Sequence, residues 1–315
     1  MKYLVTGGAG FIGSHIADYV LKRGHSVIVY DNFSTGKKLF IEHNLKNKKF
    51  SLVKGDVLNT RKLSKAMSGV DFVFHFAAHA DTKAGFLNHD VDHMQNLEAT
   101  QSVLEAMKKN NVKNIAFAST SSVYGDAKVH PTPESYPFEP TSLYGATKAA
   151  AEGYIRSYAS YYGWNAYIFR FASFIGERYT HGIIFDVLKK IKNGATVLPL
   201  FSDGTPKKSS VYIGDAIRGI FMVIDKVKKG EVNIFNIGHD GVLTIDEIVD
   251  TILSSADIII KKKYKGGNRG WKGDNNFVHL DNKKLRHLGW KPQFSIKDGI
   301  RKTVAYLQKN PKLFG

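Results

Sequence analysis

The sequence predicts an α/β protein built on a doubly wound parallel sheet, and three observations support this fold class. Short apolar runs alternate with amphipathic segments through the first half of the chain, which is the pattern of parallel strands covered by helices on both faces. A glycine-rich turn joins the first apolar run to the first amphipathic segment. The 315 residues, of which 43% are hydrophobic, are enough to bury a sizeable core.

Strands are expected where the apolar runs are short and rich in aromatic and β-branched residues. These runs are Tyr3–Val5, Val27–Tyr30, Phe50–Val53, Phe72–Phe76, Ile115–Ala118 and Tyr167–Arg170. Amphipathic stretches between them predict helices. These helices are expected at Gly13–Lys22, Val91–Lys109 and Leu143–Tyr162.

The alternation loosens after Phe171. Glycine, proline and charged residues cluster in Thr180–Lys208, which indicates an inserted lobe. A helix at Asp215–Lys226 and a strand at Asn233–Ile237 are expected to rejoin the sheet. The T-x-x-E that begins at Thr244 has the spacing of a helix capping box, and the tail beyond it is predicted to be mostly helical.

The composition limits the function classes. Because the chain has no cysteine, disulfides and thiolate metal sites are excluded, and no other grouping has metal-ligand spacing. The first residues enter an apolar strand directly and no apolar run reaches the ~20 residues of a membrane span, so we expect a cytoplasmic protein without a membrane partner. The net charge is +17, but only Lys261–Lys263 forms a compact basic run. We therefore expect a solvated lysine-rich surface rather than a nucleic-acid site.

The segment TGGAGFIGS, Thr6–Ser14, follows the first strand and opens the first helix. Its glycines at Gly7, Gly10 and Gly13 fit the spacing of a dinucleotide-binding loop. Glycines allow a tight turn and close backbone approach, while the helix N-terminus offers free amides to a pyrophosphate. The sequence therefore predicts a Rossmann-type dinucleotide site.

An acidic residue refines the cofactor prediction. Asp31 closes the second strand, where a carboxylate can bind the ribose hydroxyls and would repel a 2′-phosphate, so NAD is favoured over NADP. Asp56 follows the third strand and could meet the adenine amino group, although an isolated acid there serves equally well as a turn residue. The resulting division is a Rossmann-type NAD-binding domain at 1–172, rejoined by about 211–237, and a smaller, discontinuous substrate-binding lobe at 173–210 and 238–315.

Tyr144 and Lys148 suggest acid–base chemistry. They are four residues apart on a predicted helix and so share one face, an arrangement that packing alone could also explain. An ordinary tyrosine, with a pKa of ~10, is a poor base at neutral pH, but a nearby cation stabilises its phenolate. The hydroxyl-rich segment ASTSSVYG, Ala118–Gly125, ends the fifth strand and would face the same site.

Taken in order, TGGAGFIG, HFAA, ASTSSVYG, Y-x-x-x-K and FRFASFIGER resemble the extended short-chain dehydrogenase/reductase family, in its NAD-dependent epimerase/dehydratase branch. DNFSTG, YIGDA, FNIG and LGWKP extend this resemblance to about Pro292. The resemblance implies a nucleotide-sugar 4-epimerase of the UDP-glucose/UDP-galactose type. It also implies tightly bound NAD, a UDP-hexose substrate and a homodimer formed through the helices after Val91 and Leu143.

The resemblance implies roles for individual residues. The catalytic residues would be Thr120, Tyr144 and Lys148. The residues that would contact NAD are Gly7, Gly10, Phe11, Ile12, Gly13, Asp31, Asn32, Ser34, Thr35, Gly36, Asp56, Val57, Phe76, Ala77, Ala78, Asn96, Tyr144, Lys148 and Phe171. The residues that would contact the nucleotide sugar are Thr120, Ser121, Tyr144, Ser173, Lys208 and Arg269.

Departures from the family pattern bear on the reaction. Dehydrating members carry Asp-Glu after the catalytic threonine and decarboxylating members usually keep a Glu, whereas this chain has Ser121 and Ser122. Oxidation, rotation and re-reduction of the sugar need no carboxylate there, so 4-epimerisation is favoured. Ser173 replaces a common Asn, Lys208 replaces a diphosphate-binding Arg, and Arg269 lies two residues upstream of the usual Arg. These changes leave the nucleoside and the sugar open.

Other interpretations remain. The chain could be another nucleotide-sugar epimerase, a net oxidoreductase on a nucleotide sugar, or a non-catalytic NAD-sensing module. The presence of Thr120, Tyr144 and Lys148 argues against the last of these. His79 and His181 could be extra acids or bases, but a structural or substrate-contact role is favoured for both.

Overall fold

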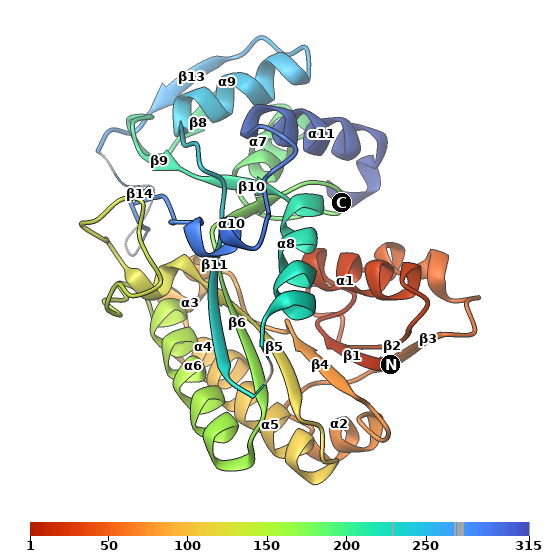
Figure 1. Cartoon of the computed structure of the whole chain (residues 1–315). Coiled ribbons are helices and arrows are strands. Elements are labelled where there is room, and N and C mark those ends of the chain that lie inside the picture. The colour runs from red at the N-terminus through yellow and green to blue at the C-terminus, as the bar shows by residue number, and fades with distance from the viewer. Residues whose placement is uncertain (229, 268, 270–273, 315) are drawn as a thin grey trace.

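A computed structural model describes residues 1–228, 230–267, 269 and 274–314, with the backbone only at 82–84. Among these residues, a seven-stranded sheet forms the centre of the larger part of the molecule (Figure 1). Its order is β11-β6-β5-β4-β1-β2-β3, and every neighbouring pair is parallel. The strands are β1 (Lys2–Thr6), β2 (Ser26–Asp31), β3 (Phe50–Lys54), β4 (Phe72–His75), β5 (Asn114–Thr120), β6 (Asn165–Phe171) and β11 (Val232–Ile237). The predicted fold class is confirmed.

Helices cover both faces of this sheet (Figure 1). Alternate residues of β1 show why: Val5 belongs to the core that includes α1 and α8, and Leu4 belongs to the core that includes α2, α5 and α6. The helical elements of this part are α1 (Phe11–Lys22), η1 (Lys38–Phe40), η2 (Glu42–Asn44), α2 (Thr60–Ala66), α3 (Thr82–Leu87), α4 (His89–Asp92), η3 (His93–Glu98), α5 (Ala99–Lys109), η4 (Ser121–Tyr124), α6 (Leu143–Tyr162) and α8 (Ile213–Lys226).

One expected helix is not regular. The segment predicted as a single helix at Val91–Lys109 contains the end of α4, a π-helical segment at η3 and then α5. The Thr100 hydroxyl donates to the Asn96 carbonyl over 2.6 Å, and side-chain bonds of this kind compete with the regular helical ladder. The sequence prediction was therefore wrong about the geometry of 93–98, although the chain stays helical throughout.

The smaller part of the molecule is built from short strands and helices. They are β7 (Ser173–Ile175), α7 (Ile183–Lys192), β8 (Val197–Leu200), β9 (Lys207–Lys208), β10 (Ser210–Tyr212), β12 (Leu243–Thr244), α9 (Ile245–Ser255), β13 (Lys261–Tyr264), β14 (Phe277–Val278), α10 (Lys283–His287), α11 (Ile296–Lys309) and η5 (Pro311–Phe314). Thr244 and Glu247 form the predicted capping box of α9. Figure 1 shows this part above the carboxyl edge of the main sheet. The division into two domains stays a prediction.

A buried ion pair ties α6 to the sheet. Arg170 on β6 donates to both carboxylate oxygens of Glu152 on α6, over 3.0 and 2.8 Å, and both side chains are almost completely buried. The Ser119 hydroxyl donates to the same carboxylate over 2.5 Å. Arg170 also donates to the Tyr124 hydroxyl over 2.9 Å. These contacts fix α6 against the strands that carry the site described below.

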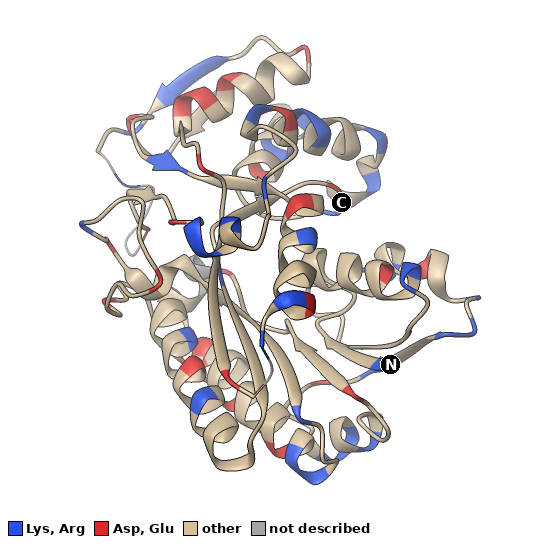
Figure 2. Cartoon of the chain, in the orientation of Figure 1, with Lys and Arg blue, Asp and Glu red and all other residues tan. Residues whose placement is uncertain are grey.

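Lys and Arg residues are spread over both parts of the molecule (Figure 2). The compact run predicted from the sequence, Lys261–Lys263, lies on β13, where Lys262 pairs with Asp246 and Asp250 of α9. Within the described residues, no helix combines the length and the apolar character that crossing a membrane requires.

Candidate active site

The glycine loop after β1 has no room for a side chain at Gly7 or Gly13. Gly7 has a φ of 67°, and a Cβ placed on it would lie 2.8 Å from the backbone nitrogen of Ala77. A Cβ on Gly13 would collide with the carbonyl oxygen of Gly7 and lie 2.8 Å from Gly8 Cα. The loop follows β1 and lies beside the end of the neighbouring strand β4, where the strand order of the sheet reverses. Parallel sheets bind their ligands at such a point. These residues fit the pyrophosphate of a dinucleotide.

Gly13 and Gly153 offer a matched pair of variants for this loop. We expect Gly13→Ala to weaken NAD binding by about 10- to 100-fold, because overpacking costs about 1–3 kcal/mol. A Cβ on Gly153, inside α6, would meet nothing within 4 Å. Gly153→Ala should keep NAD binding and stabilise the protein by up to about 1 kcal/mol. Calorimetric NAD titration and thermal unfolding check both expectations, and equal NAD affinity in the two variants would contradict the role of the loop.

Asp31 occupies the end of β2 beside this loop. Its carboxylate accepts the backbone N–H groups of Ala9 and Phe33, each over 2.8 Å. Burial raises the pKa of the Asp31 carboxyl above its usual value, while the two amide hydrogen bonds act in the opposite direction. A Cβ on Gly36 would lie 2.8 Å from Asp31 Oδ1, so the following loop folds closely over the carboxylate. The oxygens have further acceptor capacity for ribose hydroxyls.

Asp31→Asn tests the choice between NAD and NADP. The asparagine keeps one acceptor oxygen for the loop amides but removes the charge that repels a 2′-phosphate. We expect NAD affinity to fall by about 10- to 150-fold, because lost charge-assisted hydrogen bonds cost about 1.5–3 kcal/mol. The preference for NAD over NADP should narrow. Parallel titrations with the two cofactors measure this, and equal affinity of the unaltered protein for both would contradict the prediction.

The loops after β2, β3 and β4 lie against the glycine loop. Asn32 donates to the Asp56 carboxylate over 2.9 Å, which joins the loops after β2 and β3. Thr6 Oγ1 accepts the N–H groups of Phe76 and Ala77 over 3.2 Å each, which joins the loops after β1 and β4. The other predicted NAD contacts lie in these loops or in the first turns of the adjoining helices. They are Gly10, Phe11, Ile12, Ser34, Thr35, Val57 and Ala78.

Asn96 is placed differently from the other predicted NAD contacts. Its side-chain oxygen accepts the His79 N–H over 2.9 Å, and its amide donates to the His79 carbonyl over 3.1 Å. The same amide approaches the Asp92 carboxylate at 3.3 Å. The side chain is buried, so Asn96 holds the backbone that follows β4. A direct contact with NAD stays a prediction.

The three predicted catalytic residues come from β5 and α6. Ser142 caps α6 by accepting the Gly145 N–H over 3.1 Å, which places Tyr144 in the first turn. Thr120 ends β5 and forms a hydrogen bond with Tyr144. Lys148, buried one turn after Tyr144, donates from Nζ to the Ala118 carbonyl over 2.8 Å. The fold thus gathers all three at the carboxyl edge of the sheet.

Burial dominates the ionisation of this pair. Burial, together with the nearby Asp92 carboxylate, raises the pKa of Tyr144 to about 12. The hydrogen bond from Thr120 acts in the opposite direction but is outweighed. Burial lowers the pKa of Lys148 to about 7, while the Glu152 and Asp92 carboxylates act to raise it. Tyr144 therefore holds its proton at neutral pH and becomes a base only when positive charge is brought close to it. Lys148 and a nicotinamide cation are the expected sources of that charge.

Several predicted substrate contacts lie around these residues. Ser121 begins the short helix η4, whose N-cap is Thr120. Phe171 is the β6 residue paired with Thr120, and Ser173 follows on β7 with its side chain exposed. His181 lies two residues before α7, and its ring stacks on that of Tyr179. The Tyr179 ring also makes an edge-to-face contact with Phe11, at the start of α1, with ring centroids 5.6 Å apart.

The two predicted diphosphate ligands are brought together but are not free. Lys208 Nζ pairs with Asp274 over 2.9 Å and also donates to the Asn275 carbonyl. Arg269 pairs with Asp126 over 2.5 Å and approaches the Asp274 carbonyl at 3.5 Å. A diphosphate would have to replace these carboxylates. Binding by Lys208 and Arg269 stays a prediction.

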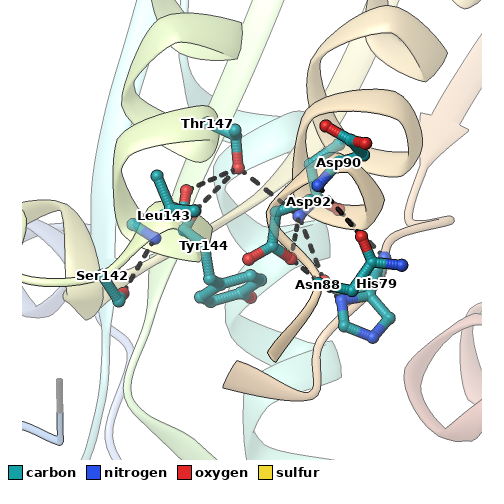
Figure 3. A network of polar contacts seen from close by, with 10 residues as sticks. His79, Asn88, Asp90, Asp92, Ser142, Leu143, Tyr144 and Thr147 are labelled. Atoms are coloured by element: carbon teal, nitrogen blue, oxygen red, sulfur yellow. Dashed lines mark hydrogen bonds and ion pairs between the residues drawn. The ribbon is translucent and has the colours of Figure 1, made fainter. Parts of the chain in front are cut away.

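Sequence reasoning missed two buried carboxylates beside the Tyr144–Lys148 pair. Glu152 lies four residues after Lys148 on α6, so helical periodicity alone could have placed it on the same face. Asp92 lies on α4 and is 1% exposed. No spacing rule joins it to Tyr144, because the two are brought together only by the packing of α4 on α6 (Figure 3).

Comparisons with known proteins agree with this geometry. Residues 3–238 match the model of the NAD dependent epimerase/dehydratase family. The chain is 33% identical, over 98% of both chains, to a putative UDP-glucose 4-epimerase of Methanocaldococcus jannaschii. It is similar to the Thermotoga maritima UDP-glucose 4-epimerase solved with UDP-glucose, with a TM-score of 0.89 and 30% identity over 99% of this chain and 100% of that one. It is equally similar to the dTDP-glucose 4,6-dehydratase DesIV of Streptomyces venezuelae solved with NAD, with a TM-score of 0.90 and 30% identity over 99% and 98%.

The chain therefore belongs to the NAD-dependent epimerase/dehydratase family and is a nucleotide-sugar-modifying enzyme. The family identification and the predicted NAD cofactor are confirmed. Relatives of comparable similarity carry the names of epimerases, dehydratases and decarboxylases, so similarity alone does not select the reaction.

Proposed function

We propose that the protein is a nucleotide-sugar 4-epimerase of the UDP-glucose/UDP-galactose type that retains NAD through each turnover. The observation that carries the proposal is the Thr120, Tyr144 and Lys148 arrangement combined with two serines, Ser121 and Ser122, directly after the threonine. Dehydration and decarboxylation in this family use acidic residues at those positions. The serines begin η4, where the Ser122 N–H donates to Thr120 Oγ1 over 3.1 Å.

The residues define a simple sequence of proton movements. When bound in the glycine loop and at Asp31, NAD supplies the reversible redox chemistry at sugar C4. Thr120 orients the C4 hydroxyl, and Tyr144 takes its proton as the hydroxyl becomes a ketone. The keto-sugar turns so that C4 is reduced on its opposite face, and Tyr144 returns the proton to the C4 oxygen. Lys148 contributes positive charge near the phenolate and a hydrogen-bond donor for the nicotinamide ribose.

Two measurements test this proposal. Mass spectrometry of the ligands that survive purification should find NAD. Any co-purified nucleotide sugar is removed before the assay. The protein is then given UDP-glucose or UDP-galactose, and the products are separated by chromatography. We expect each sugar to yield the other with no added reductant and no net reduction of the cofactor.

The alternatives give different products. An oxidised sugar with stoichiometric reduction of NAD would identify a dehydrogenase. A product lighter by one water would identify a dehydratase. Retention of NAD without turnover of any nucleotide sugar would favour the NAD-sensing interpretation, and each of these results would overturn the epimerase proposal.

A further inference from the structure

A buried acid–base cluster lies behind Tyr144, outside the predicted catalytic residues. Asp92 Oδ1 and His79 Nδ1 are 2.9 Å apart, and the Asn96 amide approaches the same oxygen at 3.3 Å. Because an ionised carboxylate only accepts hydrogen bonds, His79 must carry a proton on Nδ1. Figure 3 shows Tyr144 at the start of α6 extending toward the side on which Asp92 and His79 lie.

This cluster is joined to the catalytic helix through hydrogen bonds. The Asn96 amide reaches Thr147 Oγ1 at 3.5 Å, and that hydroxyl donates to the backbone carbonyls of Leu143 and Tyr144 over 2.9 and 3.1 Å. A Cβ on Gly85 of α3 would collide with Asp92 Oδ2, so the carboxylate is pressed against backbone on that side. Asp92 therefore has a fixed position relative to Tyr144.

Few other charges share this environment. The loop after β4 contributes His79. Helix α6 contributes Tyr144, Lys148 and the buried Glu152 carboxylate, which pairs with Arg170 of β6 and also acts on Lys148. From η3 the facing group is the uncharged Asn96, and from α3 it is the backbone of Gly85, while the side chains of 82–84 lie outside the described part of the chain. Of the other described charged or titratable groups between Asp81 and Glu98, Asp81, His89, Asp90 and His93 are exposed and Glu98 is partly exposed.

On the basis of the proposed function, we propose that Asp92 is a positioning residue for proton transfer. Its buried charge sets the pH range in which Tyr144 and Lys148 have the protonation states that the reaction requires. A negative charge beside a phenol opposes ionisation of the phenol, and beside an ammonium group it preserves the cation. Asp92 thus favours the charged form of Lys148, together with Glu152, and disfavours the phenolate form of Tyr144. Asp92 raises the pKa of both groups, so removing its charge moves both apparent ionisations to lower pH.

Asp92→Asn tests the proposal with little change in shape. We expect both limbs of the pH profile of kcat/KM to move to lower pH by about one unit, the scale of a nearby charge effect. If Asp92 had only a structural role, its replacement would lower activity and leave both limbs of the pH profile in place. Asp92→Ser, which also removes the charge but adds no bulk, is the second variant if Asp92→Asn folds poorly by circular dichroism.

Asp215 provides the matched control. It is also 1% exposed, lies in the first turn of α8 and accepts the N–H groups of Gln293 and Phe294 over 2.9 and 3.1 Å. Asp215→Asn should cost stability, yet leave the pH limbs of the remaining activity unmoved. The proposal about Asp92 would be overturned if the limbs of the pH profile stayed in place in the Asp92 variants or moved to higher pH. Either result would leave the proposed epimerase function unaffected.

A second measurement needs no substrate. The ultraviolet difference spectrum between the protein and its Tyr144→Phe variant follows the Tyr144 phenolate as pH rises in the NAD-bound protein. In the Asp92→Asn background the same difference should appear at lower pH. If the protein turns over no nucleotide sugar, the proposed function fails, and this titration still decides whether Asp92 controls Tyr144.

Discussion

Replacing Tyr144 with phenylalanine should reduce epimerase turnover by roughly 10²- to 10⁴-fold, the usual contribution of a positioned acid–base group. The change removes one oxygen from a side chain in the first turn of α6 and leaves the ring to pack as before. The thermal midpoint and NAD affinity should therefore stay close to those of the unaltered protein. Steady-state assay with the best nucleotide-sugar substrate, beside NAD titration, measures all three.

Two companion variants separate the roles in this site. Thr120→Val should lower turnover while NAD is retained, because it removes the hydroxyl that contacts Tyr144 and accepts the Ser122 N–H but leaves the glycine loop unchanged. Lys148→Met should weaken NAD retention and move the pH optimum upward, because it removes the cation that favours the phenolate. If Tyr144→Phe stays within a few fold of the unaltered protein, the tyrosine is not the base, and His79 and His181 become the residues to test.

Breaking the buried Glu152–Arg170 pair should produce the largest loss of stability. We expect Glu152→Leu to lower the free energy of unfolding by about 3–5 kcal/mol, because it leaves the Arg170 guanidinium buried without its carboxylate. Both side chains are at most 2% exposed, so water cannot replace the lost partner. Urea denaturation followed by circular dichroism measures the change.

An exposed ion pair and a double variant are the controls. Arg23 and Asp225 form a comparable pair at 2.8 Å, but their side chains are 37% and 46% exposed. Asp225→Asn should therefore cost less than about 1 kcal/mol. Glu152→Leu combined with Arg170→Met should recover much of the loss, because the guanidinium is removed together with its carboxylate. A Glu152→Leu loss as small as that of Asp225→Asn would contradict the assignment of this pair as a main stabilising contact of α6.

The local patterns of the chain were enough to predict the sheet and the NAD cofactor. The apolar runs and the glycine loop are short-range features, and the glycine spacing is dictated by backbone approach within one turn. The strand at Asn233–Ile237 and the helix Leu143–Tyr162 were predicted within one residue of β11 and α6. Tyr144 and Lys148 could be paired because helical periodicity alone puts them on one face.

Tertiary packing decided what surrounds those residues. The sequence determined that Lys148 follows Tyr144 on a helix, but only the fold buries it, brings Glu152 and Asp92 near it and lowers its pKa to about 7. It also identified Lys208 and Arg269 as cations, but only the structure pairs them with Asp274 and Asp126. The physical reason is range: backbone geometry and periodicity act within a few residues, whereas burial and charge depend on groups that the chain brings together from distant positions.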